Sequence, residues 1–513
     1  MTFRVYAPGA RRMELRLAPD TGQEHRLPMP RAAESGFFER HVADAGAGTR
    51  YRLRRDERWP QADPASHFQP EGVFGASEVI NHRYAWQHTA WQGVHPRDLV
   101  LYEVHVGAFS SEGTYAGVEQ HLGHLRELGI TGIKLMPLAT WSGERNWGYD
   151  GVFHNAPFAG YGRPEQLQRL IDACHGHGIA VILDVVTNHF GPEGNPMWDM
   201  ARPFFCKKSN TPWGPGPRFE REEILAYFDA MARHFRQHYR FDGLRLDAVD
   251  AIDPRYRHEH IQRLARALED HGDSGDEDKH PILFLESIEQ QHDLLEVKAQ
   301  GTSVLQLDFD YQRSCHRLVT GEKHAEYSAH IDPAADFESC LREGFCSSAS
   351  HGQAPKEMHW STLVTYLVNH DSAGNRYLGQ RLQALVTAET FRACTALLLL
   401  HPAVPYLFMG QEWATERAFH FFTDFEHALG RRVAKGREHG FREVDFRRCR
   451  EKPPHPQSST ALEASTLDWR EREEGHKAEH LAFTRELLNV RKTVRPLMSD
   501  STAQTQVSRQ GRC

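Results

Sequence analysis

The feature that most constrains the fold of this chain is an alternation, beginning near residue 97, of apolar runs of strand length with amphipathic helical segments. In the first such segment, Val118, Leu122 and Leu125 recur at the spacing of one helix face. The alternation is typical of parallel βα units, because each helix returns the chain to begin the next strand beside the last. We expect eight strands, within residues 99–107, 130–138, 179–189, 243–249, 281–287, 303–310, 362–371 and 403–410.

Eight strands that alternate with helices over roughly 320 residues predict an α/β fold, a closed (β/α)8 TIM barrel, rather than an open sheet. We place this barrel at residues 97–430. Residues 1–90 contain short strands separated by Gly, Pro and Asp turns, which predict an N-terminal β-sandwich. Residues 431–513 predict a polar loop, one helix within residues 480–497, and a disordered tail from residue 499.

Polar side chains gather where four of the predicted strands finish. In GLRLDAV, Arg245 and Asp247 lie on one face of the strand, because successive side chains alternate. A buried Arg–Asp pair could by itself do no more than hold the strand in place. However, Glu286 ends the fifth strand and Asp371 the seventh, and like charges brought together in a packed barrel cost energy. Because strand ends meet at the catalytic face of a barrel, a shared catalytic role explains these carboxylates better than separate structural roles. The polar residues at the four ends are Asp184, Asn188, His189, Arg245, Asp247, Glu286, His370 and Asp371.

Glycoside cleavage uses such carboxylates, because one attacks the anomeric carbon while another protonates the leaving oxygen. Arg245 shares a strand face with Asp247 and would keep that carboxylate ionised, which suits a nucleophile. Glu286 has no adjacent cation in the sequence and follows the apolar run ILFL, a setting that raises a carboxyl pKa toward that of a general acid/base. Asp371 would then stabilise the oxocarbenium-like transition state or orient sugar hydroxyls.

Four segments carry a resemblance to a known family. DVVTNH, GLRLDAV, the glutamate of the fifth strand and VNHD resemble, as a set and in this order, the short conserved segments of the α-amylase family of glycoside hydrolases. The resemblance implies an N-terminal carbohydrate-binding-like β-domain, a catalytic barrel and a C-terminal β-domain, and the chain ends where that last domain would begin. Longer stretches, among them NWGYDGVFHNAPFAGYGRPE and VNHDSAGNRYLGQRL, resemble the members of the family that act on maltooligosyltrehalose.

The resemblance implies a retaining hydrolase that cuts the α-1,4 bond next to the terminal trehalose unit and releases trehalose. It gives Asp247, Glu286 and Asp371 the same roles as the chemical argument does. It implies neither a cofactor nor a metal. Trp147 is added as an aromatic platform for a sugar ring, although a role in the core suits a lone tryptophan equally well. The implied substrate-binding residues are Tyr149, Asp150, Asn188, His189, Arg245, His370 and Trp147.

The chain departs from the family pattern beside the nucleophile, where Asp250 replaces an expected histidine. Residues 287–294 and the sixth strand differ as well. If a turn brings Asp250 to the rim of the site, it would raise the pKa of nearby carboxyl groups and weaken binding of the trehalose unit. If it caps the following helix, it would take no part in the site.

Two other functions fit some of these features. A glycogen branching enzyme shares the domains and the carboxylates but passes the glycosyl unit to a sugar hydroxyl, whereas HDSAGNR after the seventh strand follows the hydrolase pattern. A degenerate barrel that only binds glucan would explain the altered flanks, but the three carboxylates are intact.

Composition excludes several other classes. With 61 basic and 69 acidic residues the net charge is −8, and no basic block is long enough to track nucleic acid. The chain shows no signal peptide and no apolar run of membrane-spanning length, which predicts a cytoplasmic protein. Its eight cysteines form no CxxC pair, and its 33 histidines show no zinc-binding spacing, so we expect reduced thiols and no metal.

Overall fold

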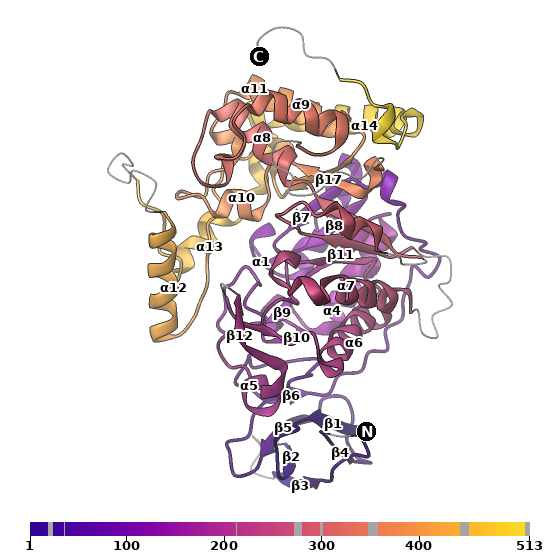
Figure 1. The fold of residues 1–513 in the computed structure, drawn as a ribbon, viewed down its shortest axis with the longest axis vertical. Coiled ribbons are helices and arrows are strands. Elements are labelled where there is room, and N and C mark those ends of the chain that lie inside the picture. The colour runs from indigo at the N-terminus through magenta and orange to yellow at the C-terminus, as the bar shows by residue number, and fades with distance from the viewer. Residues whose placement is uncertain are drawn as a thin grey trace.

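The computed structural model describes residues 1–18, 24–34, 36–211, 213–270, 280–297, 301–346, 358–441 and 451–507. Three regions follow one another along its longest axis (Figure 1). The N-terminal strands lie at one end, the barrel lies in the middle, and helices from the second half of the chain cover the other end.

A closed barrel of eight parallel strands forms the middle of the molecule, in the order β11-β14-β15-β16-β17-β18-β7-β8. Each predicted barrel strand contains one of these strands, so the predicted TIM barrel is confirmed. Their bounds are β7 (Leu101–Val104), β8 (Gly132–Leu135), β11 (Ala180–Val185), β14 (Gly243–Leu246), β15 (Ile282–Leu285), β16 (Ser303–Leu307), β17 (Leu363–Tyr366) and β18 (Val404–Phe408).

Helices connect the strands and cover the outside of the barrel (Figure 1). Leu244 and Leu246 of β14 point outward into the apolar layer that the helices share with the strands. The alternate positions point inward, where apolar residues such as Ile182 and Phe284 fill the barrel below a charged layer. The helices are α1 (Val106–Phe109), α2 (Tyr115–Glu119), α3 (Leu122–Leu128), α4 (Pro164–Gly176), α6 (Glu222–Tyr239), α7 (Pro254–Glu269), α8 (Phe309–Thr320), α9 (Pro333–Glu343), α10 (His370–Gly374) and α11 (Ala388–Leu400).

The N-terminal region is a β-sandwich, as predicted. Strands β1 (Thr2–Tyr6) and β4 (Phe37–His41) pair in one sheet. The second sheet has the order β3-β2-β5-β6. Phe3, Leu15, Phe38 and Leu53 are among the residues of the core between the sheets. The sequence did not predict β3, because this edge strand has mostly exposed side chains and carries Pro28, so it shows no apolar alternation. The strands of the second sheet are β2 (Met13–Leu17), β3 (His25–Met29), β5 (Arg50–Arg55) and β6 (Ser77–Glu78).

The connection between β11 and α6 contains regular structure that the sequence did not indicate. It includes helix α5 (Met197–Met200) and a hairpin of β12 (Phe205–Thr211) and β13 (Gly214–Pro217). Glycine and proline make up all of β13, so its composition indicated turns. Two further antiparallel strands, β9 (Ala139–Thr140) and β10 (Phe153–Pro157), lie between β8 and α4.

The C-terminal region is more helical than predicted. Helices α12 (His427–Gly440) and α13 (Ser459–Ser465) occupy part of the predicted polar loop, and the predicted helix is α14 (Gly475–Val494). Only Gly430 and Ala434 of α12 are buried, so the sequence of this helix shows no apolar stripe from which it could be predicted. None of the helices in the described part of the chain has the length and apolarity that a membrane span requires.

The prediction of a disordered tail from residue 499 was wrong for its first part. The carbonyl of Asp500 accepts a hydrogen bond from Trp360 N at 2.7 Å, and its carboxylate accepts one from Ser361 Oγ at 2.6 Å. These contacts are polar, so the low apolar content of the segment did not indicate them. Residues 508–513 lie outside the described residues.

Candidate active site

Four alternating charges form a buried layer near the carboxyl ends of strands β7, β8, β11 and β14. The strand register places Glu103 opposite Lys134, and Asp184 opposite Arg245. Lys134 Nζ lies 2.9 Å from Glu103 Oε1 and also pairs with Asp184. Arg245 Nη1 donates to Asp184 Oδ1 at 2.8 Å. Because a buried charge is costly unless it is paired and hydrogen-bonded, each member of this layer fixes its neighbours.

Arg245 also holds the two carboxylates that the sequence predicts to do the chemistry. Its Nη1 lies 3.1 Å from Asp247 Oδ1, and its Nη2 lies 2.5 Å from Glu286 Oε1. Asn188 Nδ2 donates to Asp247 Oδ2 at 3.0 Å. The backbone of Ala248 takes the left-handed conformation, with φ of 39°, and its N–H donates to Glu286 Oε2 at 2.8 Å. Both carboxylates are therefore fixed on one guanidinium at the ends of neighbouring strands.

Glu286 has no adjacent cation in the sequence, but the fold places one beside it. Arg245 is the register partner of Phe284 on the neighbouring strand, two residues before Glu286. Side chains two residues apart on a strand share a face, so the guanidinium reaches Glu286 as well as Asp247. A contact across two strands cannot be read from the spacing within either one.

Four buried carboxyl groups of the site, those of Glu103, Asp184, Asp247 and Glu286, fall into two pairs by the direction in which their pKa values are shifted. Glu103 and Asp184 are buried, but Lys134 beside Glu103 and Arg245 beside Asp184 hold the pKa of each carboxyl below its ordinary value. Burial raises the pKa of Asp247 and of Glu286, and outweighs the lowering by Arg245. We expected Arg245 to keep the Asp247 pKa low, but this guanidinium contacts three carboxylates and cannot offset the burial of each.

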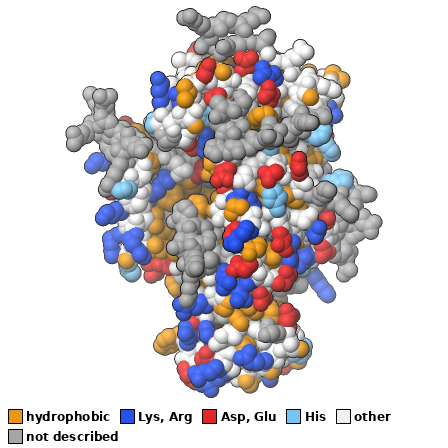
Figure 2. All heavy atoms as spheres, in the orientation of Figure 1, with side chains coloured by type: hydrophobic (Ala, Val, Ile, Leu, Met, Phe, Trp, Pro, Cys, Tyr) orange, Lys and Arg blue, Asp and Glu red, His pale blue; other side chains and the backbone are white. Residues whose placement is uncertain are grey.

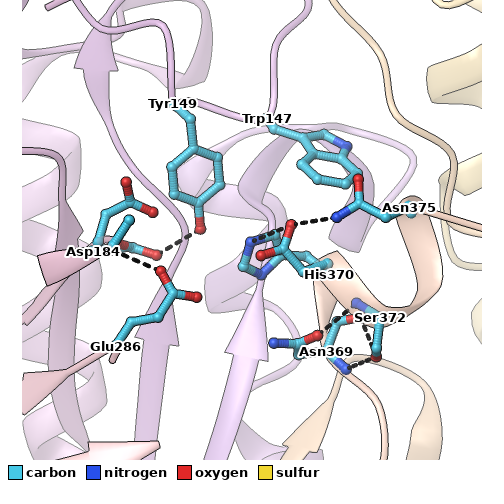
Figure 3. Close-up of polar contacts among 12 residues, drawn as sticks. Trp147, Tyr149, Asp184, Glu286, Asn369, His370, Ser372 and Asn375 are labelled. Atoms are coloured by element: carbon cyan, nitrogen blue, oxygen red, sulfur yellow. Dashed lines mark hydrogen bonds and ion pairs between the residues drawn. The ribbon is translucent and has the colours of Figure 1, made fainter. Parts of the chain in front are cut away.

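His370 and Asp371 begin helix α10, directly after strand β17. His370 Nδ1 donates to Glu103 Oε1 at 2.6 Å, which joins the helix to the charged layer. Asn375 Nδ2, one turn along α10, donates to Asp371 Oδ1 at 3.0 Å, and Figure 3 shows Asn375 directed toward this carboxylate. The Asp371 side chain is 42% exposed. Burial of its carboxyl group nevertheless raises the pKa of Asp371.

The predicted substrate-binding residues converge on the same region, with one exception discussed below. The Tyr149 hydroxyl donates to Asp184 Oδ2 at 2.8 Å, and its ring stacks on His370 with centroids 5.1 Å apart (Figure 3). His189 Nε2 donates to the carbonyl of Tyr149 at 2.8 Å. Asn146 Nδ2 donates to Asp150 Oδ2 at 2.8 Å. Arg245 is 2% exposed and is occupied by carboxylates, so it positions them and does not reach solvent.

Trp147 is not a platform for a sugar ring. Its side chain is buried at 4% exposure, and its indole N–H donates to the carbonyl of His420 at 2.9 Å. Phe419 stacks on the ring. His370, which Figure 3 also shows, meets the ring edge-on. A role as a sugar platform and a role in the core both suited a lone tryptophan in the sequence. The packing around the ring shows that Trp147 belongs to the core.

Asp250 does not cap the following helix. Asp253 does so for α7, where its carboxylate accepts from Arg255 N. Asp250 instead holds the segment after Glu286, because its carboxylate accepts from Ser287 Oγ at 2.9 Å and from Glu289 N at 3.1 Å. Burial raises the pKa of Asp250.

Sequence reasoning missed several residues of the site. Glu103 and Lys134 are each a single charge within an apolar strand, and that interruption could have indicated them. Trp213 is 49% exposed and stacks on His189 with ring centroids 5.2 Å apart, but the sequence around it gave no indication of a site. Arg437 of α12 donates to Asn375 Oδ1 at 2.6 Å and could be found only in three dimensions.

Two groups of described side chains could hold a metal ion, and neither includes the three predicted catalytic carboxylates. One consists of His67, His82 and His234, and the other of His330, Asp336 and Cys346.

A closed (β/α)8 barrel that fixes acidic residues at the carboxyl ends of its strands defines a glycoside hydrolase of the α-amylase type. The family model "Alpha amylase, catalytic domain" matches residues 87–213, and "Carbohydrate-binding module 48 (Isoamylase N-terminal domain)" matches residues 1–67. The malto-oligosyltrehalose trehalohydrolase of Deinococcus radiodurans is 35% identical over 509 residues, which cover 96% of this chain and 80% of that relative. The chain belongs to the malto-oligosyltrehalose trehalohydrolase family.

Two further comparisons bear on the assignment. A crystal structure of a "Putative alpha Amylase" from Salmonella typhimurium is similar with a TM-score of 0.90 and 34% identity, over 99% of this chain and 88% of that one. A 1,4-alpha-glucan branching enzyme of Streptomyces coelicolor is 31% identical over 271 residues, which are 49% of this chain and 36% of that enzyme. The similarity to the branching enzyme is therefore confined to part of each protein.

Proposed function

We propose that this enzyme hydrolyses the α-1,4 bond next to the terminal trehalose unit of maltooligosyltrehalose, with retention of configuration, and releases trehalose. The relatives that match most of the chain support the substrate, because they carry the name of this activity. The observation that supports this chemistry is that Asp247 and Glu286 each form an ion pair with one of the two terminal nitrogens of Arg245. Two carboxyl groups held side by side suit a double displacement.

In the proposed first step, the Asp247 carboxylate attacks the anomeric carbon while Glu286 gives its proton to the glycosidic oxygen. The bond to the trehalose unit breaks, trehalose leaves, and a glycosyl ester forms on Asp247. In the second step the Glu286 carboxylate takes a proton from water, and the oxygen of that water attacks the anomeric carbon. The ester bond breaks, which restores the Asp247 carboxylate and the Glu286 proton. Asp371 would stabilise the positive charge that develops on the sugar.

The electrostatics of the site support this division of roles. Burial raises the pKa of both carboxyl groups, and an ionised Asp247 raises the pKa of Glu286 further. Once Asp247 ionises, Glu286 therefore keeps its proton to higher pH. Each carboxyl group accepts from Arg245 and from one further N–H, so the donors do not distinguish them. We assign the charge to Asp247 and the proton to Glu286, because the charge of Asp247 raises the pKa of Glu286.

Several residues are proposed to contact the sugars. Tyr149 and His370 lie beside the catalytic pair, and His189 together with the exposed ring of Trp213 would bind the glucan further out. A cavity of about 510 Å³, lined in part by Asn375 and Arg437, opens beside α10 and offers room for further sugar units.

We also propose a reducing, cytoplasmic location. The cysteine pattern supports it, because the eight cysteines of the sequence are scattered and form no CxxC pair. Cell fractionation with an antibody against the chain tests this location.

The proposal is tested with maltotriosyltrehalose as substrate and chromatography of the products. We expect trehalose and maltotriose in equal amounts, with the new reducing end in the α configuration by NMR. A branched product would indicate the branching enzyme, and absence of any reaction would indicate a protein that only binds glucan. A β-configured reducing end would rule out retention.

Asp247→Asn should abolish turnover, because a nucleophile acts in the chemical step, while glucan binding is largely kept. Asp253→Asn is the matched control, because Asp253 lies six residues further on and caps α7 on the surface. More than about a hundredth of the wild-type rate in Asp247→Asn would contradict the assignment, since covalent catalysis contributes more than that.

A further inference from the structure

Three histidines meet where the segment that joins the β-sandwich to the barrel crosses helix α6. His67 and His82 lie on either side of β6 in that segment, and His234 lies on α6. Helix α6 lies on the side of the barrel nearest the N-terminal strands (Figure 1), and its Glu223 accepts a hydrogen bond from Tyr6 of β1. The three side chains therefore come from two parts of the fold that nothing in the local sequence joins.

The rings are close enough to share one ion. One nitrogen or another of each ring lies within 4.8 Å of its counterparts on the other two. His67 Nδ1 and His82 Nε2 are 2.9 Å apart. The ring of His234 lies 4.2 Å from that of His67 and 5.0 Å from that of His82, between centroids. Tetrahedral zinc with nitrogen at 2.0–2.1 Å requires ligand nitrogens about 3.3 Å apart, which side-chain rotation can reach from here.

His234 presents a lone pair that the protein itself does not use. Its Nε2 lies 3.1 Å from the carbonyl oxygen of Asn155, and a carbonyl only accepts, so Nε2 carries the hydrogen. In a neutral imidazole the other nitrogen, Nδ1, is then an acceptor. Nδ1 is buried and has no hydrogen-bond partner among the described residues. A buried acceptor without a partner is costly, and a ring that donates to a backbone carbonyl is the arrangement found in histidines that bind metals.

The other two rings of the cluster meet through their ring nitrogens. One hydrogen serves the contact between His67 and His82, and a cation there would accept lone pairs from both rings. His238, one turn along α6, stacks on His82 with centroids 4.1 Å apart and fixes the plane of that ring.

We propose that His67, His82 and His234 bind one divalent transition-metal ion, for which Zn²⁺ is the best fit, and that this ion joins the interdomain segment to α6. Three imidazoles and a water would complete a tetrahedral shell. The hard cations Ca²⁺ and Mg²⁺ prefer oxygen ligands and would not be retained. The site is independent of the proposed hydrolysis.

The test is metal binding by the full chain after treatment with a chelator. Zn²⁺ is measured by competition with a chromophoric chelator, and Co²⁺ by its visible absorption. We expect one ion per chain, with a tetrahedral Co²⁺ band that intensifies as the site fills. His234→Phe and His67→Gln should each weaken Zn²⁺ binding by about a hundredfold or more and remove the band, since even the loss of an indirect partner costs 10–100-fold. His25→Gln, on the exposed strand β3, is the control and should bind as the wild type does.

The melting temperature supplies a second readout. One equivalent of Zn²⁺ should raise it for the wild type and the control, because an ion that binds only the folded state stabilises it, but not for the cluster variants. His82→Gln replaces any variant that fails to fold. Equal Zn²⁺ affinity in the wild type, the control and the cluster variants would overturn the proposal, because it would show that Zn²⁺ binds elsewhere, either at surface histidines or at the group of His330, Asp336 and Cys346. Absence of the Co²⁺ band in the wild type would overturn it as well.

Discussion

Asp250 fixes the segment that follows Glu286, the proposed acid/base. Loss of the Asp250 carboxylate should therefore lower the rate of the reaction. Asp250→Ala removes the acceptor for Ser287 Oγ and Glu289 N, so Glu286 is held less firmly. We expect kcat for maltotriosyltrehalose to fall roughly tenfold, because small displacements of a catalytic group have large kinetic effects. Steady-state kinetics across the pH range checks this expectation.

Asp253→Ala is the matched control for Asp250, since both are aspartates of the turn between β14 and α7. It should cost about 1 kcal/mol of stability through the lost helix cap and leave kcat unchanged. If Asp250→Ala behaves in the same way, Asp250 has only a structural part.

Glu286 should make the protein less stable as the pH rises. Its pKa in the folded state is raised above the ordinary value, so from about pH 4.3 upward the folded state binds more protons than the unfolded one, and stability falls with increasing pH. Glu286→Gln has no carboxyl to ionise. We therefore expect this variant to melt at a higher temperature than the wild type at pH 7, with a difference that disappears below about pH 4.

Glu322 should change the pH dependence of stability in the opposite direction to Glu286. It is partly buried, but hydrogen bonds from Arg376 and His316 hold the pKa of its carboxyl well below the ordinary value. Stability from this group is present above the unfolded pKa and is lost as the pH falls. Glu322→Gln should therefore melt lower than the wild type at pH 7. Equal pH dependence of the two variants would contradict the assigned directions.

At the scale of elements, helix α12 braces the helix that carries Asp371. Arg437 donates to Asn375 Oδ1 and to the carbonyl of Gly374, both at 2.6 Å, and Asn375 in turn donates to Asp371. The guanidinium also lies over the ring of Phe421 at 4.4 Å. Two segments far apart in sequence thus set the position of one carboxylate.

Arg437→Met keeps the apolar contact and removes the hydrogen bonds. We expect kcat to fall about fivefold to tenfold, with a smaller change in KM, because Asp371 acts mainly in the transition state. Arg432→Met on the same helix is the control. Arg432 is exposed, where α12 forms the basic edge of the molecule visible in Figure 2, and should have no effect on kcat. Similar values of kcat for the two variants would remove Arg437 from the site.

In the molecule as a whole, the C-terminal helix α14 packs firmly against the barrel. Arg491 is 4% exposed, and its guanidinium donates to the carbonyls of Leu399 at 3.0 Å and Ala403 at 2.7 Å, just before β18. Arg491→Met leaves these carbonyls unsatisfied, and we expect a loss of about 2–4 kcal/mol in the free energy of unfolding.

Urea unfolding monitored by fluorescence measures this loss. Lys492→Met is the control, because the neighbouring side chain is exposed and should change stability by less than about 0.5 kcal/mol. If both substitutions have equally small effects, α14 does not stabilise the barrel.

The barrel and the identity of the three acidic candidates could be predicted from the residues alone. A strand buried on both faces is a short apolar run whatever its neighbours are, so all eight strands left a local signal. Asp247, Glu286 and Asp371 follow such runs, and a carboxylate at the end of a buried strand stands out by its chemical type. Elements without a buried apolar face, such as β3 and α12, left no such signal.

The groups that these carboxylates contact could not be predicted in this way, because they depend on how the strands pack. Arg245 contacts Glu286 as well as Asp247 because strands β14 and β15 lie side by side. The register between the two strands cannot be read from the sequence of either one. The burial of Trp147 and the meeting of His67 with His234 likewise depend on how distant segments pack. Distances and burial determine pKa values and metal binding, and both arise only when the chain has folded, so the sequence could name the candidate groups but not their charges or their partners.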